Sequence, residues 1–267
     1  MYTDTHCHLY LPVFQTDLDS VLERAWAAGL TRILLPGIDL ETSRQAIQLS
    51  ERDPRLFAAV GVHPNDCANW NAASLAELRA LAAHPKVVAI GEIGLDYYWE
   101  ETEHELQAQV LREQLDLAAE CNLPVVIHSR QSWNDLWDIL QRWQRDLASQ
   151  GAALAASPGV LHSFEGDAGQ ARQAVEHNFL LGVSGPVTFK NARGRQDMVA
   201  DTAVEFLLTE TDAPYLTPDP FRGRRNEPAH VVRITDKIAE LHQQRLERTA
   251  RITSKNASRL FRWDDTD

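Results

Sequence analysis

Cysteine is scarce in this sequence, which has only Cys7, Cys67 and Cys121 in 267 residues. Three thiols spaced so widely cannot form a disulfide framework, and an odd number of them is more typical of a reducing compartment than of a secreted protein. The N-terminus also lacks the basic start and apolar stretch of a signal peptide. We therefore expect a cytoplasmic protein.

Long apolar runs and positive charge are scarce as well. No stretch of about 18 uninterrupted apolar residues occurs, so we expect no transmembrane helix and no membrane partner. The 26 Lys and Arg residues are outnumbered by 38 Asp and Glu residues, which gives a formal net charge of −12. Such a charge repels nucleic acids and anionic membranes at long range. A polyanionic substrate would need metal ions or an arginine cluster to bind.

Short apolar segments alternate with longer amphipathic ones along the chain. The short segments are typical of strands that are buried on both faces of a parallel sheet. We expect eight of them, at residues 2–7, 32–35, 58–62, 87–90, 124–127, 159–161, 180–183 and 206–209. The expected helices cover residues 18–28, 42–52, 74–83, 105–121, 133–150, 170–178, 197–203, 228–242 and 249–261. Glu77, three residues after Ser74, predicts a capping box at the start of the third helix.

A strand followed by a helix, repeated eight times, predicts parallel strands with right-handed crossovers. Both an open doubly wound sheet and a closed barrel have this order. The open sheet usually carries a glycine-rich phosphate loop after its first strand, whereas here the first strand runs into His6-Cys7-His8. The pattern therefore favours an α/β fold in which residues 1–267 form a single (β/α)8 TIM barrel domain.

Histidines and carboxylates gather at the C-terminal ends of the predicted strands. In a (β/α)8 barrel these ends converge on one mouth, where active sites are built. His6 and His8 are two residues apart on a strand, so both side chains face the same side. A buried Glu92 is costly unless it is paired or binds metal. The predicted metal ligands at this mouth are His6, His8, Glu92, His128, His162 and Asp212.

The roles of these ligands follow from their strands. Asp212 ends the last strand, and it could bind the same cation as the histidine pair and take a proton from its bound water. His128 and His162 would complete a second site, and Glu92 could bridge the two cations. Mixed imidazole and carboxylate ligands suit Zn, Mn, Co or Ni, and Mg stays open because it is abundant. Two such cations can activate a bridging hydroxide and clamp a phosphoryl group.

Five further residues at the mouth are candidates for contacts with substrate. His63 is interpreted as a catalytic acid for the leaving group or as a phosphate contact. Asp96 either orients a metal ligand or contacts substrate. Arg130, Lys190 and Arg222, on loops after the fifth, seventh and eighth strands, would bind a phosphoryl group, to which arginine is well shaped.

Ordered motifs cover the whole chain: DTHCHL at 4–9, GVHP at 61–64, GEIGLD at 91–96, PVVIHSR at 124–130, LHSFEG at 161–166, SGPVTFKNA at 184–192, TETDAPYL at 209–216, RGRRNEPAHV at 222–231 and KNASRLF at 255–261. Together they resemble the TatD family of metal-dependent hydrolases, which includes TatD-type deoxyribonucleases and a YjjV-like branch. The resemblance implies an amidohydrolase-like TIM barrel with two cations. It assigns one cation to His6, His8, Glu92 and Asp212, and the other to Glu92, His128 and His162. Glu165 departs from the family, because many relatives carry a small hydroxyl residue there.

Three functions stay open at this point. The first, implied by the resemblance, is a metal-dependent phosphodiesterase that acts on DNA ends or small phosphoesters as a 3′-5′ exonuclease, with Asp212, Glu92 and His63 as its catalytic residues. The second is hydrolysis of an amide, ester or lactone by the same hydroxide. The third is a metal-binding interaction protein without catalysis. The basic residues at the mouth favour the first, and no obligate protein partner is inferred.

Overall fold

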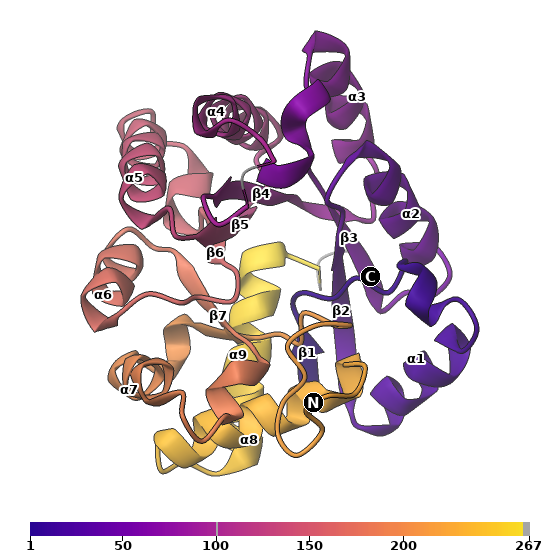
Figure 1. Cartoon of the computed structure of the whole chain (residues 1–267). Helices are drawn as coiled ribbons and strands as arrows, with labels where there is room; N and C mark the ends of the chain where they lie inside the picture. The colour runs from indigo at the N-terminus through magenta and orange to yellow at the C-terminus, as the bar shows by residue number, and fades with distance from the viewer. Residues whose placement is uncertain (100, 264–267) are drawn as a thin grey trace.

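The computed structural model describes residues 1–99 and 101–263. Eight parallel strands form one sheet in sequence order. They are β1 (Tyr2–Asp4), β2 (Leu30–Pro36), β3 (Leu56–Val60), β4 (Val87–Asp96), β5 (Val125–Arg130), β6 (Gly159–Leu161), β7 (Leu180–Val183) and β8 (Leu207–Thr209). The segment that follows β1 pairs with the end of β8 and the segment after it: the N–H of Thr5 donates a hydrogen bond to the carbonyl of Thr209, and Cys7 forms a parallel β-bridge with Ala213. The sheet is therefore a TIM barrel, which confirms the predicted fold (Figure 1).

Most of the helices pack around the outside of the strands, and the last one crosses one end of the barrel (Figure 1). They are α1 (Leu18–Ala27), α2 (Leu40–Ser50), α3 (Ala72–Ala82), α4 (His104–Cys121), α5 (Trp133–Ser149), α6 (Ala168–Glu176), α7 (Arg193–Asp201), α8 (Val231–Leu241) and α9 (Leu246–Phe261). Short 3-10 helices lie at Pro12–Phe14, Pro64–Asn69, Ala153–Ala156, Gly185–Thr188, Val204–Phe206 and Pro228–His230. Within the described residues, no helix is both long and apolar enough to cross a membrane.

Helix α3 begins earlier than the sequence pattern predicts. The side chain of Asn71 accepts hydrogen bonds from the backbone N–H groups of Ala73 and Ser74, and Oγ of Ser74 accepts one from the N–H of Asn71. The capping box is therefore Asn71 with Ser74, and the predicted box of Ser74 with Glu77 is wrong. Glu77 instead forms an ion pair with Arg44 of α2.

Strand β4 extends further than its apolar segment. Residues 93–96 continue to pair with residues 127–130 of β5, so the strand ends at Asp96 instead of Ile90. Gly91 permits this close pairing, because a Cβ there would lie 2.6 Å from Cβ of Val126. The extension carries Glu92 and Asp96 on a rigid strand.

Helix α9 closes the end of the barrel opposite the mouth. Its residues Leu260 and Phe261, together with Trp263, join a buried cluster with Phe57 and Val88, which lie at the starts of their strands. Trp263 is fully buried, and its ring lies 5.4 Å from that of Phe57. The barrel is thus sealed on this side, which leaves the C-terminal mouth as its open end.

Candidate metal centre

The first group of polar side chains lies where the segments after β1 and β8 meet. His6 and His8 follow β1, are both buried, and place their Nε2 atoms 3.2 Å apart. Asp212 follows β8, and its Oδ1 lies 3.4 Å from Nε2 of His8 and 3.9 Å from Nε2 of His6. The N–H of Asp212 donates to the carbonyl of His6, which fixes the two segments against each other. Asp212 has a φ of 57°, a left-handed conformation of the kind that clusters at functional sites.

His8 presents its Nε2 atom to this group because its other nitrogen is engaged. Nδ1 of His8 lies 2.8 Å from the hydroxyl of Tyr10 and 3.2 Å from the carbonyl of Pro36. A hydrogen bond from Nδ1–H to the carbonyl leaves Nε2 with a free lone pair. Such partners orient metal-ligating imidazoles in proteins.

Glu92 lies between two groups of imidazoles. Its Oε2 is 3.2 Å from Nε2 of His6, while its Oε1 is 3.1 Å from Nδ1 of His128 and 3.9 Å from Nε2 of His63. The side chain is buried, and burial raises the pKa of its carboxyl group. The charge of His6 and the hydrogen bonds from His128 and His6 outweigh this effect and hold that pKa well below its ordinary value. Glu92 is therefore an anion whose two oxygens face different partners.

His128 is held between two carboxylates. Its Nε2 lies 2.9 Å from Oδ2 of Asp96, and its Nδ1 faces Glu92. Burial lowers the pKa of His128, but the hydrogen bonds to Asp96 and Glu92 outweigh burial and raise it to about 9. Asp96 also accepts hydrogen bonds from the N–H groups of Tyr98 and Trp99, so it is fixed in place itself. In this structure Asp96 orients His128.

His162 has a corresponding partner, Glu210, to which the sequence interpretation gave no role. Nδ1 of His162 lies 2.9 Å from Oε1 of Glu210, and the His162 ring stacks on that of His6 at 3.5 Å. Burial lowers the pKa of His162, but the charge of Glu210 raises it to about 10. Glu210 is fully buried and also accepts hydrogen bonds from the Thr5 hydroxyl and the Ser163 N–H. Its signal in the sequence is a carboxylate that directly follows the apolar last strand.

His63 reaches the same centre from the loop after β3. Its Nδ1 accepts a hydrogen bond from the N–H of Asn65, and its Nε2 faces Glu92. Burial, followed by the charge of His128, lowers the pKa of His63 to about 3. The imidazole is therefore neutral near pH 7. Because Nδ1 accepts a hydrogen bond, the ring proton lies on Nε2, and binding a cation through Nε2 would require the loss of that proton.

Three groups of side chains have donor atoms close enough to hold a cation. The atoms of each group lie within 4.8 Å of one another. The groups are His6, His8 and Asp212; His6, Glu92 and His162; and His63, Glu92 and His128. All combine imidazole nitrogens with a carboxylate, the donor set that transition-metal ions prefer. The six predicted ligands are thus brought together, and they fit divalent cations; His63 joins them as a further donor.

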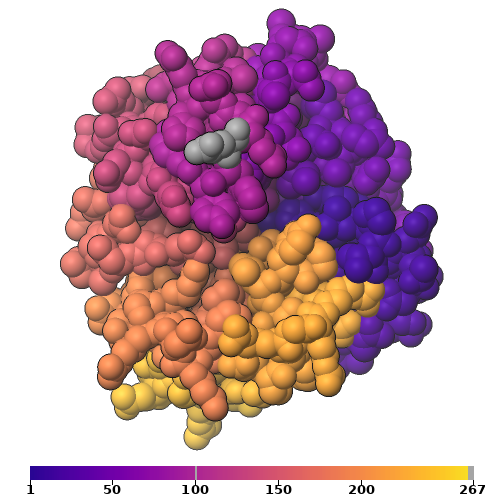
Figure 2. Space-filling view, in the orientation of Figure 1, coloured from indigo at the N-terminus to yellow at the C-terminus, as the bar shows by residue number. Residues whose placement is uncertain are grey.

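A cavity of about 690 Å³ opens this centre to solvent. Figure 2 shows the surface hollowed at the middle of this face, between the magenta segment after β4 and the orange segment after β8. Arg130 lines the cavity, with its guanidinium 3.8 Å from the ring of Tyr98. Lys190 and Arg222 are not among the lining residues, and Arg222 lies over the ring of Phe189 at 4.1 Å. Their part in substrate binding stays a prediction.

Comparison with known proteins shows the family to which the chain belongs. A family model described as TatD related DNase matches residues 3–262. The chain belongs to the TatD family. It is 44% identical to the uncharacterized metal-dependent hydrolase YabD of Bacillus subtilis over 98% of this chain and 99% of the relative. As a TatD family member it is a metal-dependent hydrolase.

Two further TatD relatives are informative. The chain is 36% identical to a protein named 3′-5′ ssDNA/RNA exonuclease TatD from Enterobacter lignolyticus, over 97% of this chain and 98% of that one. The crystal structure of YJJV, a TatD homologue from Escherichia coli, superimposes with a TM-score of 0.89 at 33% identity and covers 98% of both chains. Both matches extend over the whole barrel.

Proposed function

We propose that this TatD family member is an exonuclease that hydrolyses the phosphodiester bond at the end of a single nucleic-acid strand, using two divalent cations. The placement of Glu92 carries the proposal, because its two carboxylate oxygens face two separate groups of imidazoles. The similarity to relatives named exonucleases supports the same substrate class. No observation on the described residues favours an amide, ester or lactone substrate, or a non-catalytic protein.

Each proposed cation would be held by residues from several strands. We propose that His6, His8, Glu92 and Asp212 would hold the first, and that Glu92, His128 and His162 would hold the second. In the structure the donor atoms of His162 group with those of His6 and Glu92, whereas those of His128 group with Glu92 and His63. When bound, such a pair supplies an activated water and positive charge for the phosphoryl oxygens. Zn, Mn, Co, Ni and Mg are all compatible with these donors.

Asp212 is positioned to accept a proton. Burial raises its carboxyl pKa, but the hydrogen bond with His8 and the charges of His162 and His6 lower it below its ordinary value. The group is therefore a carboxylate at neutral pH. Its side chain stays partly open to the cavity, where an attacking water would enter.

Arg130 and two exposed aromatic rings would bind the substrate strand. Arg130 is the only lysine or arginine among the described residues that line the cavity. Trp99 and Tyr215, which are 47% and 57% exposed, line it as well. Aromatic side chains hold single-stranded nucleic acids by stacking on their bases. Asp66 and Glu101 also line the cavity, and their charge disfavours a long phosphate backbone, which supports an end of a strand as the substrate.

The proposed location is the cytoplasm. All three cysteines are free thiols, and Cys7 and Cys67 are buried. Unpaired thiols are typical of reducing compartments.

The test is a nuclease assay on the purified protein. Single-stranded oligonucleotides, duplexes, a phosphodiester dye and acyl esters are each incubated with Mg, Mn, Zn or Co. We expect cleavage of the single strand from its 3′ end with at least one cation. Asp212→Asn and Glu92→Gln should each lower kcat by about 1000-fold or more while the melting temperature of the metal-free protein changes little. Glu176→Gln, which changes an exposed carboxylate at the end of α6 that does not line the cavity, is the matched control and should retain activity. Hydrolysis of esters alone, or full activity in Glu92→Gln, would overturn the proposal.

A further inference from the structure

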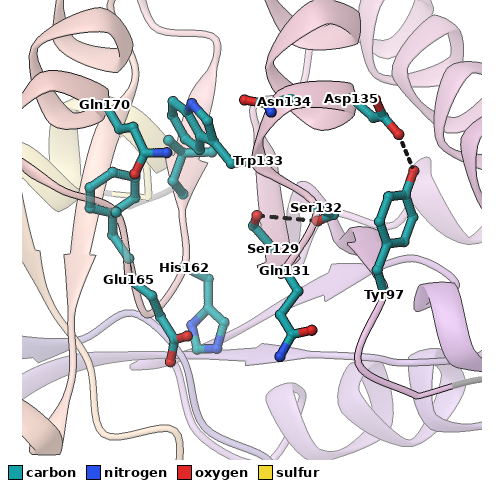
Figure 3. A pocket seen from close by; sticks show the side chains of 13 residues that line it. Tyr97, Ser129, Gln131, Ser132, Trp133, Asn134, Asp135, His162, Glu165 and Gln170 are labelled. Carbon is teal, nitrogen blue, oxygen red and sulfur yellow. Dashed lines mark hydrogen bonds between the residues drawn. The ribbon is translucent and has the colours of Figure 1, made fainter.

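A second cavity, of about 470 Å³, adjoins the metal centre. It lies between the loop after β5 with the first turn of α5 and the loop after β6. The two cavities share Ser129, His162 and Glu165 in their linings. Figure 3 shows His162 and Gln131 at one end of this side pocket and Trp133 and Gln170 at the other. A ligand seated here would therefore reach the metal centre at His162.

One wall of the side pocket is aromatic. The ring of Phe164 packs against that of Trp133 at 5.7 Å, and Trp133 in turn stacks on Trp137 at 5.3 Å with an interplanar angle of 5°. Phe164 and Trp137 are buried, so this wall is supported from behind by the core. Rings held in this way cost little entropy when a flat ligand packs against them.

The polar groups of the side pocket are mostly uncharged. Within the part of the chain that the structure describes, no lysine or arginine lines it. Its two carboxylates are already engaged, since Asp135 accepts a hydrogen bond from Tyr97 and Glu165 pairs with Arg195. Such a pocket does not suit a phosphate.

Two amide side chains are available to a ligand. Gln131 and Asn134 line the pocket, and neither side chain makes a hydrogen bond with another described residue. Gln131 has a φ of 55°, so its backbone takes the left-handed conformation directly after β5 and next to the metal centre. An amide offers both a donor and an acceptor, which matches the edge of a nucleobase.

We propose that the side pocket binds the base of the terminal nucleotide, while its phosphodiester lies at the metal centre. This inference rests on the proposed function. The base would pack against Phe164 and Trp133, and its polar edge would point toward the amide of Gln131 at the end of the pocket next to His162. The pocket thereby favours a strand whose terminal residue carries a base over one whose terminal residue is abasic. It also positions the terminal phosphodiester for attack.

The test compares substrates with and without the terminal base. One oligothymidylate ends in a normal 3′ nucleotide, and the other ends in an abasic tetrahydrofuran residue. For the unmodified enzyme we expect kcat/KM to fall about 5- to 150-fold when the base is absent, the range that base stacking supplies. In the variants Phe164→Leu and Gln131→Asn, the fall in kcat/KM between the two substrates should be only a few-fold. Asparagine is chosen at position 131 because it tolerates the left-handed backbone there.

Gln48→Asn is the matched control. Gln48 is also an exposed glutamine that lines a cavity, but that cavity is lined by the segment after β1 together with α1 and α2, and it shares no residue with the side pocket. The control should show the same loss as the unmodified enzyme. Equal kcat/KM for the two substrates, or an unchanged loss in both pocket variants, would overturn the inference.

A binding measurement separates this inference from the proposed function. Thymidine, which carries no phosphate, is titrated into the unmodified protein and into Phe164→Leu by calorimetry. We expect binding that weakens at least fivefold in the variant. If no phosphodiester is cleaved with any cation, the proposed function fails. The titration then still tests whether the side pocket binds a nucleobase. Thymidine that does not bind, or binds both proteins equally, overturns the inference.

Discussion

Two buried carboxylates set the orientation of two histidines at the centre. Asp96 faces Nε2 of His128, and Glu210 faces Nδ1 of His162. The histidines thus use different nitrogens for their partners, which leaves the opposite nitrogen of each ring for the centre. Carboxylates in this position fix the ring and raise the basicity of a metal ligand.

Replacing Glu210 should weaken catalysis through His162. Glu210→Gln keeps the shape of the side chain but removes its charge, so His162 loses its orienting anion. We expect kcat/KM and metal affinity to fall about 10- to 100-fold. The pKa of His162 in the metal-free protein, about 10, should fall as well, as measured by NMR. Glu205→Gln, which changes an exposed carboxylate on the same segment, should alter none of these quantities. An unchanged His162 pKa would show that Glu210 does not act on this ring.

Asp66 makes the stability of the metal-free protein depend on pH. Burial and the charges of Asp39, Glu101 and Glu92 raise its pKa to about 6, above the ordinary value of 3.8. The folded state therefore binds this proton more tightly than the unfolded chain, so the contribution favours folding at low pH and is lost as the pH rises through about 6.

Asp66→Asn should therefore raise the melting temperature at pH 8 and leave it nearly unchanged at pH 4. The side chain is 42% exposed, so screening limits the gain to about 1–3 °C. Thermal unfolding monitored by circular dichroism at both pH values measures it. The exposed Asp201→Asn should show no such difference. A gain that is equal at both pH values would contradict the titration of Asp66.

At the scale of elements, α9 stabilises the barrel from the end opposite to the site. Trp263 fills the cluster that this helix forms with the strand starts. Trp263→Ala leaves a large cavity there, and we expect it to lower the free energy of unfolding by about 3–5 kcal/mol. Denaturant unfolding measures the loss, while kcat per folded molecule should stay the same. Trp26→Ala, at a half-buried tryptophan on α1, is the control and should cost less. A large drop in kcat would mean that the closed end of the barrel influences the mouth.

The apolar pattern could predict the eight strands and their order, but not where each one stops. β4 continues past Ile90 through Glu92 to Asp96, because pairing with β5, and not hydrophobicity, decides its length. The start of α3 was missed for a similar reason: Asn71 outcompetes Ser74 as the cap, and their reciprocal hydrogen bonds depend on the path of the chain into the helix.

The residues of the centre could be predicted because they sit at strand ends, which topology alone brings together. The predicted ligands His6, His8 and Asp212 meet for this reason. The partner role of Glu210 and the side pocket beside His162 depend on how loops pack after the strands end. No spacing in the sequence encodes that packing.

At the scale of the whole molecule, we expect a weak dependence on salt, because the net charge is −12 and Arg130 is the one arginine among the described residues that line the cavity. Each phosphate neutralised on a single strand contributes a slope of about −0.7 to log affinity against log salt. We expect kcat/KM for a single strand to fall less than about fivefold between 50 and 200 mM KCl. In Arg130→Ala, kcat/KM should be lower at all salt concentrations and the slope near zero. A steep slope in the unmodified enzyme would indicate an extended phosphate-binding surface that the cavity does not have.

The pairing of β1 with β8 also has a consequence for the newly made chain. His6 and His8 are made roughly 200 residues before Asp212, whose N–H donates a hydrogen bond to the His6 carbonyl. At about 5–20 residues per second, the early ligands wait on the order of 10–40 s for their partner. A chain that terminates before β8 would therefore lack the first cation site, and tight metal binding would distinguish finished molecules from fragments.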